Sequence, residues 1–167
     1  MYGKMYKIRN HCWDRGCPPI TLSRFLESAN QAWFALGNGK LGTTLYAPYA
    51  ATITRADGTP AVNIPSFVPQ NMIAAPEGAS HFKIVSAGAE VDFENNTYKV
   101  ATNVSDLLAW DTTATTVINL SSTLGAGSTL PFFLVLGIEF YQEVNGEEYP
   151  LKNGSFNALS IVKASGV

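Results

Sequence analysis

The sequence predicts a mainly β protein, an antiparallel β-sandwich of the immunoglobulin or fibronectin-III kind, with an amphipathic helix before it. Short alternating or apolar segments recur from residue 41 onward, and Gly, Pro, Asn and Asp separate them. Residues 129–144 form a long run that is apolar on both faces and leads into Asn145-Gly146, a typical hairpin turn. Charged residues make up only 14% of the chain, so the surfaces must rely on Ser, Thr, Asn and Gly.

The chain divides into a basic N-terminal segment, residues 1–37, and a β-sandwich domain, residues 38–167. In the N-terminal segment, apolar residues repeat at three- and four-residue spacing, which predicts a helix over residues 21–36. Gly37-Asn38-Gly39 ends that pattern. Residues 1–40 hold six basic and two acidic side chains, whereas the remainder holds five basic and eleven acidic ones. The six basic side chains are scattered, which favours intramolecular docking of the segment, or no role at all, over a nucleic-acid or membrane contact.

The predicted strands follow in order along the rest of the chain. Period-two alternation and turn residues place them at residues 44–54, 61–64, 81–87, 90–93, 98–100, 115–120, 130–144, 147–151 and 156–163. Residues 105–110 are predicted as a loop or helical turn. Pro48 indicates an edge position or a bulge in the first strand. Asp57-Gly58, Asn95-Asn96, Asn145-Gly146 and Asn153-Gly154 are the predicted turns.

No catalytic residue and no cofactor site is predicted. The stretch from Gly37 to Gly42 matches G-x-G-x-x-G, but a helix precedes it and a strand follows, the reverse of the dinucleotide-binding order. His81 begins a strand, and the sequence contains no nucleophile-elbow motif whose serine a histidine could activate. We therefore interpret the glycines as a helix stop and His81 as a strand-end residue.

The metal candidates are Glu90, Asp92 and Glu94, which alternate with apolar residues and project from one strand face. They could bind Ca²⁺ or form a hydrolase acid pair; the alternative is the solvated side of an edge strand. Cys12 and Cys17 lie beside His11, and the spacing leaves open two free thiols, a local disulfide or part of a zinc site.

Partner contacts are predicted through aromatic side chains: Phe25 and Trp33 on the helix, and Tyr141 and Tyr149 near the hairpin. We expect a protein partner or self-association, with no nucleic acid and no membrane insertion, and the sequence leaves open whether a small molecule binds. Residues 131–138 are too short to span a bilayer. Neither a signal peptide nor a transmembrane segment is visible, so the default expectation is a cytoplasmic location.

Four segments carry a resemblance to known sequences: residues 38–48, 64–69, 81–93, and 136–146 continuing through 157–162. Together they resemble the C-terminal β-domain of a group of uncharacterised Bacteroidetes proteins. That resemblance implies an interaction or assembly module and brings no activity, cofactor or catalytic residue with it. The sequence as a whole thus predicts a non-enzymatic binding or assembly module. A carbohydrate- or calcium-binding module is the first alternative, and a hydrolase whose acids converge only in the fold is the second.

Overall fold

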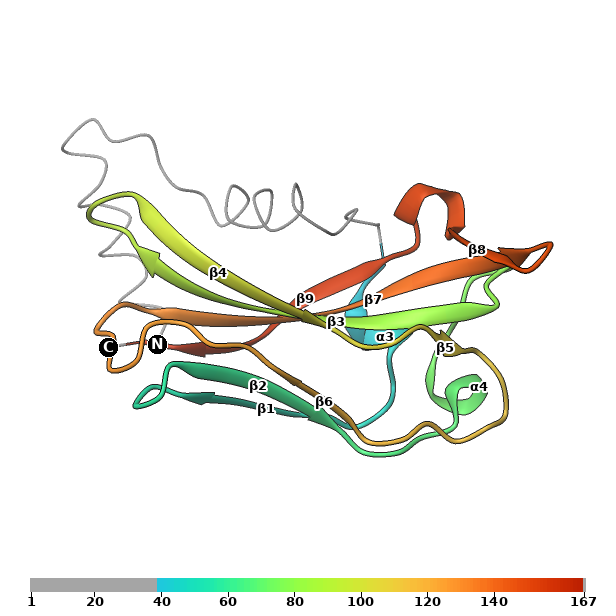
Figure 1. Cartoon of the computed structure of the whole chain (residues 1–167), viewed down its shortest axis with the longest axis horizontal. Coiled ribbons are helices and arrows are strands. Elements are labelled where there is room, and N and C mark those ends of the chain that lie inside the picture. The colour runs from blue at the N-terminus through green and yellow to red at the C-terminus, as the bar shows by residue number, and fades with distance from the viewer. Residues whose placement is uncertain (1–38, 167) are drawn as a thin grey trace.

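A computed structural model describes residues 39–166, which form two antiparallel β-sheets packed face to face (Figure 1). The prediction of a mainly β antiparallel sandwich is confirmed. The described residues contain nine strands and three short helices. In chain order these are α3 (Leu41–Thr44), β1 (Ala50–Thr54), β2 (Thr59–Ile64), α4 (Pro69–Met72), β3 (His81–Asp92), β4 (Thr97–Val104), β5 (Leu108–Ala109), β6 (Ile118–Ser121), β7 (Phe132–Val144), β8 (Glu147–Pro150), the 3₁₀ helix η1 (Leu151–Gly154) and β9 (Ala158–Ser165).

The large sheet is organised around two long strands, β3 and β7, which pair antiparallel from His81↔Tyr141 to Glu90↔Phe132. β4 and β5 pair with the other side of β3, and β8 and β9 pair with the other side of β7. β7 therefore lies inside the sheet.

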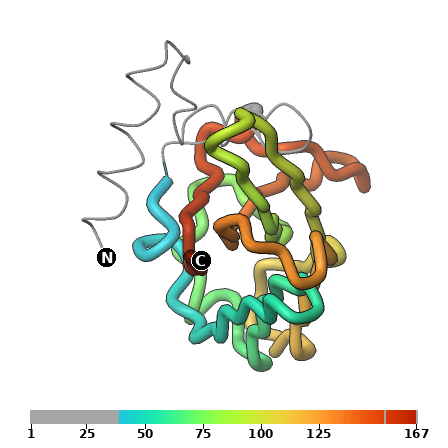
Figure 2. The backbone as a smooth tube through the Cα atoms, turned by 90° about the vertical axis from the view of Figure 1, so that its left-hand side faces the viewer, coloured from blue at the N-terminus to red at the C-terminus, as the bar shows by residue number. Residues whose placement is uncertain are grey.

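The small sheet has the order β1-β2-β6 and packs against one face of the large sheet. Figure 2 shows the two layers almost end-on, with β9 (red) descending beside the first described segment (blue). Alternate residues of β3 and β7 point into the space between the sheets. They form the main core with residues of the small sheet, and its least exposed members are Ile64, Phe82, Ile84, Leu134, Leu136, Ile138 and Ala158.

Side-chain hydrogen bonds join the two sheets at both edges. The Asn103 side chain on β4 donates to the Ser121 carbonyl on β6 at 2.7 Å. At the opposite edge, Lys163 Nζ on β9 donates to the Ala51 carbonyl on β1 at 3.0 Å. Each bond satisfies a backbone carbonyl that no neighbouring strand reaches. The sandwich is therefore closed at both edges by side chains instead of by strand pairing.

Several elements differ from the sequence prediction. The first strand begins at Ala50, because residues 41–44 form a short helix. The strands predicted at residues 81–87 and 90–93 are one continuous strand, β3. Residues 108–109 pair with β3, and Asn153-Gly154 belongs to a 3₁₀ helix. The helix predicted at residues 21–36 lies outside the described residues.

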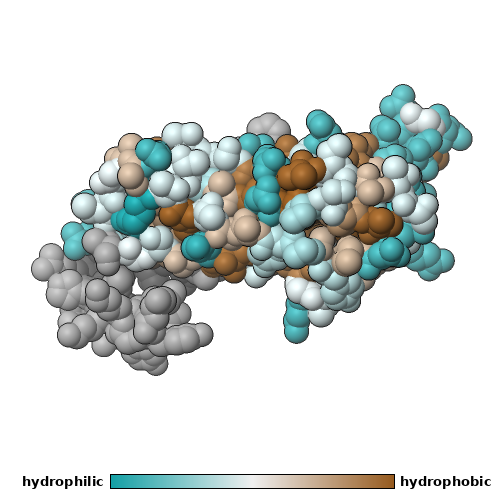
Figure 3. All heavy atoms as spheres, turned by 90° about the horizontal axis from the view of Figure 1, so that it is seen from below, coloured by the Kyte–Doolittle hydropathy of each residue, from teal (hydrophilic) through white to brown (hydrophobic). Residues whose placement is uncertain are grey.

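The outer face of the small sheet is polar and exposed, as expected for a sandwich. Figure 3 looks onto this side and shows hydrophobic residues in separate groups among hydrophilic ones. The outward side chains of the small sheet are short, and they include Thr52, Thr54, Asn63, Asn119 and Ser121. Within residues 39–166, no helix has the length and apolar character needed to cross a lipid bilayer.

Candidate functional site

The most exposed regular structure in the described chain is the end of the β7–β8 hairpin, residues 142–150, which we call the acidic hairpin. All nine residues are exposed, yet they keep the strand pairing of β7 and β8. Asn145 and Gly146 form the turn with positive φ values of 56° and 84°, as a two-residue hairpin turn requires. Figure 1 shows β8 at one end of the long axis of the molecule. A two-stranded ribbon with both faces in water gains little stability from burial.

Like charges face each other across the acidic hairpin. Glu143 is the direct register partner of Glu148, so both side chains project from the same face. Glu147 lies opposite Val144 on the other face. Directly opposed like charges destabilise a strand pair, and none of these three glutamates has a basic partner within residues 39–166. Repulsion between these carboxylates destabilises the folded hairpin unless a partner places a positive charge next to them.

The second face of the acidic hairpin carries exposed apolar surface. Tyr149 is 56% exposed and Val144 is 43% exposed, and Tyr149 pairs in register with Gln142. An exposed tyrosine next to carboxylates is typical of protein contact surfaces, because its ring buries area at a small entropic cost. Of the predicted contact residues, Tyr149 therefore lies where a partner could reach it.

Polar side chains from β3 and β7 pack together at the base of the acidic hairpin. Ser80 Oγ accepts a hydrogen bond from the Glu143 backbone N–H at 2.7 Å and lies 2.9 Å from His81 Nδ1. Tyr141 donates its hydroxyl proton to Glu139 Oε2 at 2.9 Å, and the ammonium of Lys83 lies 5.0 Å from the Tyr141 ring centroid. His81 is thus a strand-end residue tied to the hairpin base, as interpreted from the sequence.

Burial shifts the pKa values of this group. Burial raises the pKa of Glu139, against the opposing effects of the Tyr141 hydrogen bond and the Lys83 charge. Burial, the charge of Glu139 and the shared hydrogen bond raise the pKa of Tyr141 to about 12. The Tyr141 hydroxyl is thus hydrogen-bonded to Glu139 and its side chain is only partly exposed. It is therefore less accessible to a partner than Tyr149.

Replacing Glu139 with Gln is expected to raise stability at neutral pH and to change it little in acid. The raised pKa means that the folded state holds this proton more tightly, so stability falls as pH rises from the unfolded to the folded pKa of Glu139. Gln keeps an acceptor for Tyr141 and removes the charge. Urea unfolding between pH 4 and 8 should show the two stability curves diverging as pH rises. Parallel curves would contradict the prediction, and Glu94→Gln, an exposed site, is the control.

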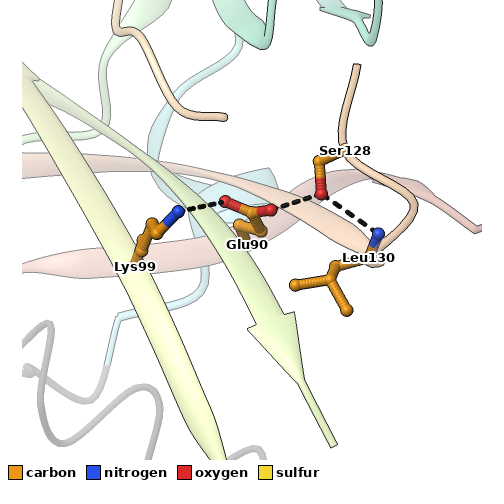
Figure 4. A network of polar contacts seen from close by, with 4 residues as sticks. All are labelled: Glu90, Lys99, Ser128 and Leu130. Carbon is orange, nitrogen blue, oxygen red and sulfur yellow. Dashed lines mark hydrogen bonds and ion pairs between the residues drawn. The ribbon is translucent and has the colours of Figure 1, made fainter. Parts of the chain in front are cut away.

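A second polar network holds the loop before β7 (Figure 4). Glu90 is only 4% exposed, and its Oε1 accepts a hydrogen bond from the Ser128 hydroxyl. Ser128 Oγ in turn accepts from the Leu130 N–H at 3.1 Å. The ammonium of Lys99, whose side chain is 73% exposed, lies 3.7 Å from Glu90 Oε2, an oxygen with no hydrogen-bond donor. Glu90 is therefore a buried loop anchor and lies away from the solvated side of the strand.

Arg55 binds the same loop from the small sheet. Its guanidinium donates to the carbonyls of Ser128 and Leu130 at 2.8 and 2.9 Å, and to the carbonyl of Ser165 at 3.2 Å. The guanidinium carbon also lies 5.1 Å from the ring centroid of Phe132. One planar fork thus fastens three segments that are far apart in the sequence, which a lysine could not reproduce.

Replacing Arg55 with Ala is expected to lower the free energy of unfolding by about 1–2 kcal/mol, since the half-buried carbonyls lose a charged donor. Arg55→Lys should recover only a minor part of the loss, because it keeps the charge and not the fork. Chemical unfolding of both variants tests this. Equal stability of the Lys variant and the wild type would mean that charge alone matters.

The predicted metal candidates do not form one site. Asp92 accepts hydrogen bonds from the backbone N–H groups of Glu94 and Asn95 and from the Asn95 side chain. These hydrogen bonds lower the pKa of Asp92, and the bond from the Asn95 backbone has the largest effect. Glu94 is exposed in the same turn. No group of three His, Cys, Asp or Glu residues that could hold a metal occurs in the described part of the chain. The other candidates, Cys12, Cys17, His11, Phe25 and Trp33, lie outside the described residues.

No protein-family model and no curated protein matches this chain. A solved structure described as "pH-induced modulation of Streptococcus parasanguinis adhesion by Fap1 fimbriae" aligns with 71% of this chain and 75% of that chain. The sequence identity is 11% and the TM-score is 0.28.

Proposed function

We propose that this domain is a non-enzymatic interaction or assembly module, and that the acidic hairpin is its contact surface for a basic protein surface. The observation that carries the proposal is the register of Glu143 opposite Glu148. A ribbon that repels itself in isolation gains the most from a partner that supplies positive charge, since unfavourable local features concentrate at functional sites.

The second face of the hairpin supports the same function. Exposed Tyr149 and Val144 supply apolar area beside the carboxylates, and interfaces commonly combine an aromatic anchor with a charged rim. The charges would steer the approach of the partner and make its association sensitive to salt. The rest of the sandwich acts as a rigid support for the ribbon.

The test compares two charge-matched double variants of the full chain. Glu143→Gln with Glu148→Gln changes the hairpin, and Asp57→Asn with Glu94→Gln removes the same charge from exposed turns elsewhere. Immobilised protein is used to capture host proteins at low and high salt, and light scattering reports self-association in parallel. The wild type and the control should retain a basic protein, or a second copy, at low salt only.

The hairpin variant should lose at least about tenfold in retention, which corresponds to 1.4 kcal/mol, while its thermal stability stays equal or rises. Equal retention by the hairpin variant would exclude the acidic hairpin as the contact surface. A strictly monomeric wild type that retains no protein above the background would overturn the interaction function itself.

A further inference from the structure

The large sheet has an apolar outer face, on the side away from the small sheet. β3 and β7 place alternate apolar residues there, and Val100 of β4 with Leu159 and Ile161 of β9 extend this surface sideways. We call it the outer apolar face. Its central side chains are buried, with exposed fractions of 0% for Ala89, 1% for Val135, 2% for Val91, 7% for Ala87 and 8% for Phe133.

This face contrasts with the outer face of the small sheet, which is polar. In an ordinary sandwich each sheet turns polar residues outward, whereas strands that are apolar on both faces are covered on both sides. Within residues 39–166, the residues of this cluster belong to the large sheet itself or, for Phe93, to the β3–β4 turn. The described residues thus supply one layer of a second core, and its other layer must come from elsewhere.

We propose that residues 21–36 of the same chain cover the outer apolar face as an amphipathic helix. The first reason is where the described chain begins. Gly39 forms a parallel bridge to Ala158 of β9, and its N–H donates to the Asn157 carbonyl at 3.3 Å. A Cβ on Gly39 would lie 3.0 Å from the Ala158 Cβ, so this close approach favours glycine. Residues 21–36 therefore end three residues before Gly39, where the chain meets β9 at the edge of the outer apolar face.

The second reason is fit. The sixteen residues would form a helix of about 24 Å, close to the roughly 23 Å spanned by the seven residues of β7 that pair with β9. The short side chains of Ala87 and Ala89 at the centre leave room for large ones opposite. The apolar positions of the segment supply them, namely Leu22, Phe25, Leu26, Ala29, Ala32, Trp33 and Leu36.

Photo-cross-linking of the full chain tests this docking directly. A benzophenone amino acid at Ile161, on the outer apolar face, should form an intramolecular cross-link to a residue between 25 and 36, within the tryptic peptide of residues 25–40 that lies between Arg24 and Lys40. The same group at Thr52, on the outer face of the small sheet, should not reach that peptide. A covalent dimer through residues 25–36 would instead make a second copy the occupant. Folded protein without any cross-link to residues 25–36 would overturn the docking.

A second measurement uses surface polarity without a cross-linker. Trp33→Asp should raise the fluorescence of a dye that binds exposed apolar surface several-fold, whereas Arg24→Asp, at a polar position of the same segment, should leave it unchanged. Cooperative thermal unfolding should persist in Trp33→Asp, because the main core lies on the other side of the sheet. Unchanged dye binding in Trp33→Asp would count against the proposal. This inference does not depend on the acidic hairpin, and either can fail alone.

Discussion

Replacing Phe82 with Ala is expected to lower the free energy of unfolding by about 3–5 kcal/mol. Phe82 is fully buried between the sheets, pairs in register with Phe140 and has its ring centroid 6.3 Å from that of Phe67. The truncation removes a whole ring, and the rigid strands cannot move in to fill the cavity that it leaves. The lost hydrophobic burial and the cost of the cavity therefore add.

Phe156→Ala is the matched control for Phe82→Ala. That ring is 38% exposed and contacts Lys152, with Nζ 4.9 Å from the centroid. The expected loss is below about 1 kcal/mol. Urea unfolding of both variants gives the comparison, and similar losses would mean that the main core is not the principal source of stability.

Gly88→Ala is expected to destabilise the protein by about 3 kcal/mol, although it adds only one methyl group. A Cβ at Gly88 would lie 2.3 Å from Pro60 Cγ and 3.3 Å from Leu124 Cδ1. Pro60 is buried in β2 and its ring is rigid, so relief requires β2 and β3 to separate.

The matched control for Gly88→Ala is Gly42→Ala. Nothing lies within 4 Å of a Cβ at that position, and its φ is not positive. This change should be neutral or stabilise by about 0.4–1 kcal/mol, because alanine reduces the entropy of the unfolded chain. The two alanine substitutions should therefore differ in sign in thermal unfolding. A Gly88→Ala variant as stable as the wild type would show that the sheets are not in tight contact there.

Gly88 also explains why the sequence predicted two strands where the structure has one. The stretch Ala87-Gly88-Ala89 breaks the expected alternation and looks like a turn. In the structure, glycine is present because the opposite sheet approaches closely at Pro60. That cause lies nearly thirty residues away in the sequence, and local patterns do not contain it. By contrast, the Asn145-Gly146 turn was predicted correctly, because positive φ values are a local requirement.

Glu90 shows a different limit of sequence patterns. Alternation identifies residues that share a face, but it does not say which face is inside. Glu90 shares its face with Phe82 and Ile84, and therefore lies inward. Arg55 could not be predicted as an anchor, since the three residues that accept its hydrogen bonds follow it by 73 residues or more. The acidic hairpin has three glutamates close together in the sequence, but only the register places Glu143 opposite Glu148.

The pairing of β3 with β7 has a consequence for synthesis of the chain on the ribosome. Most of β3 is buried on both faces in the folded sheet, and its long partner is made only after β4, β5 and β6. Translation at about 5–20 residues per second leaves β3 without that partner for seconds. During this interval β4 can pair with one edge of β3, but the other edge stays open, and an open strand edge is the kind of segment that aggregates and that chaperones bind. We therefore expect the sandwich to fold late, when β7 and then β9 emerge, and nascent chains that stop before Phe132 to depend on chaperones for solubility.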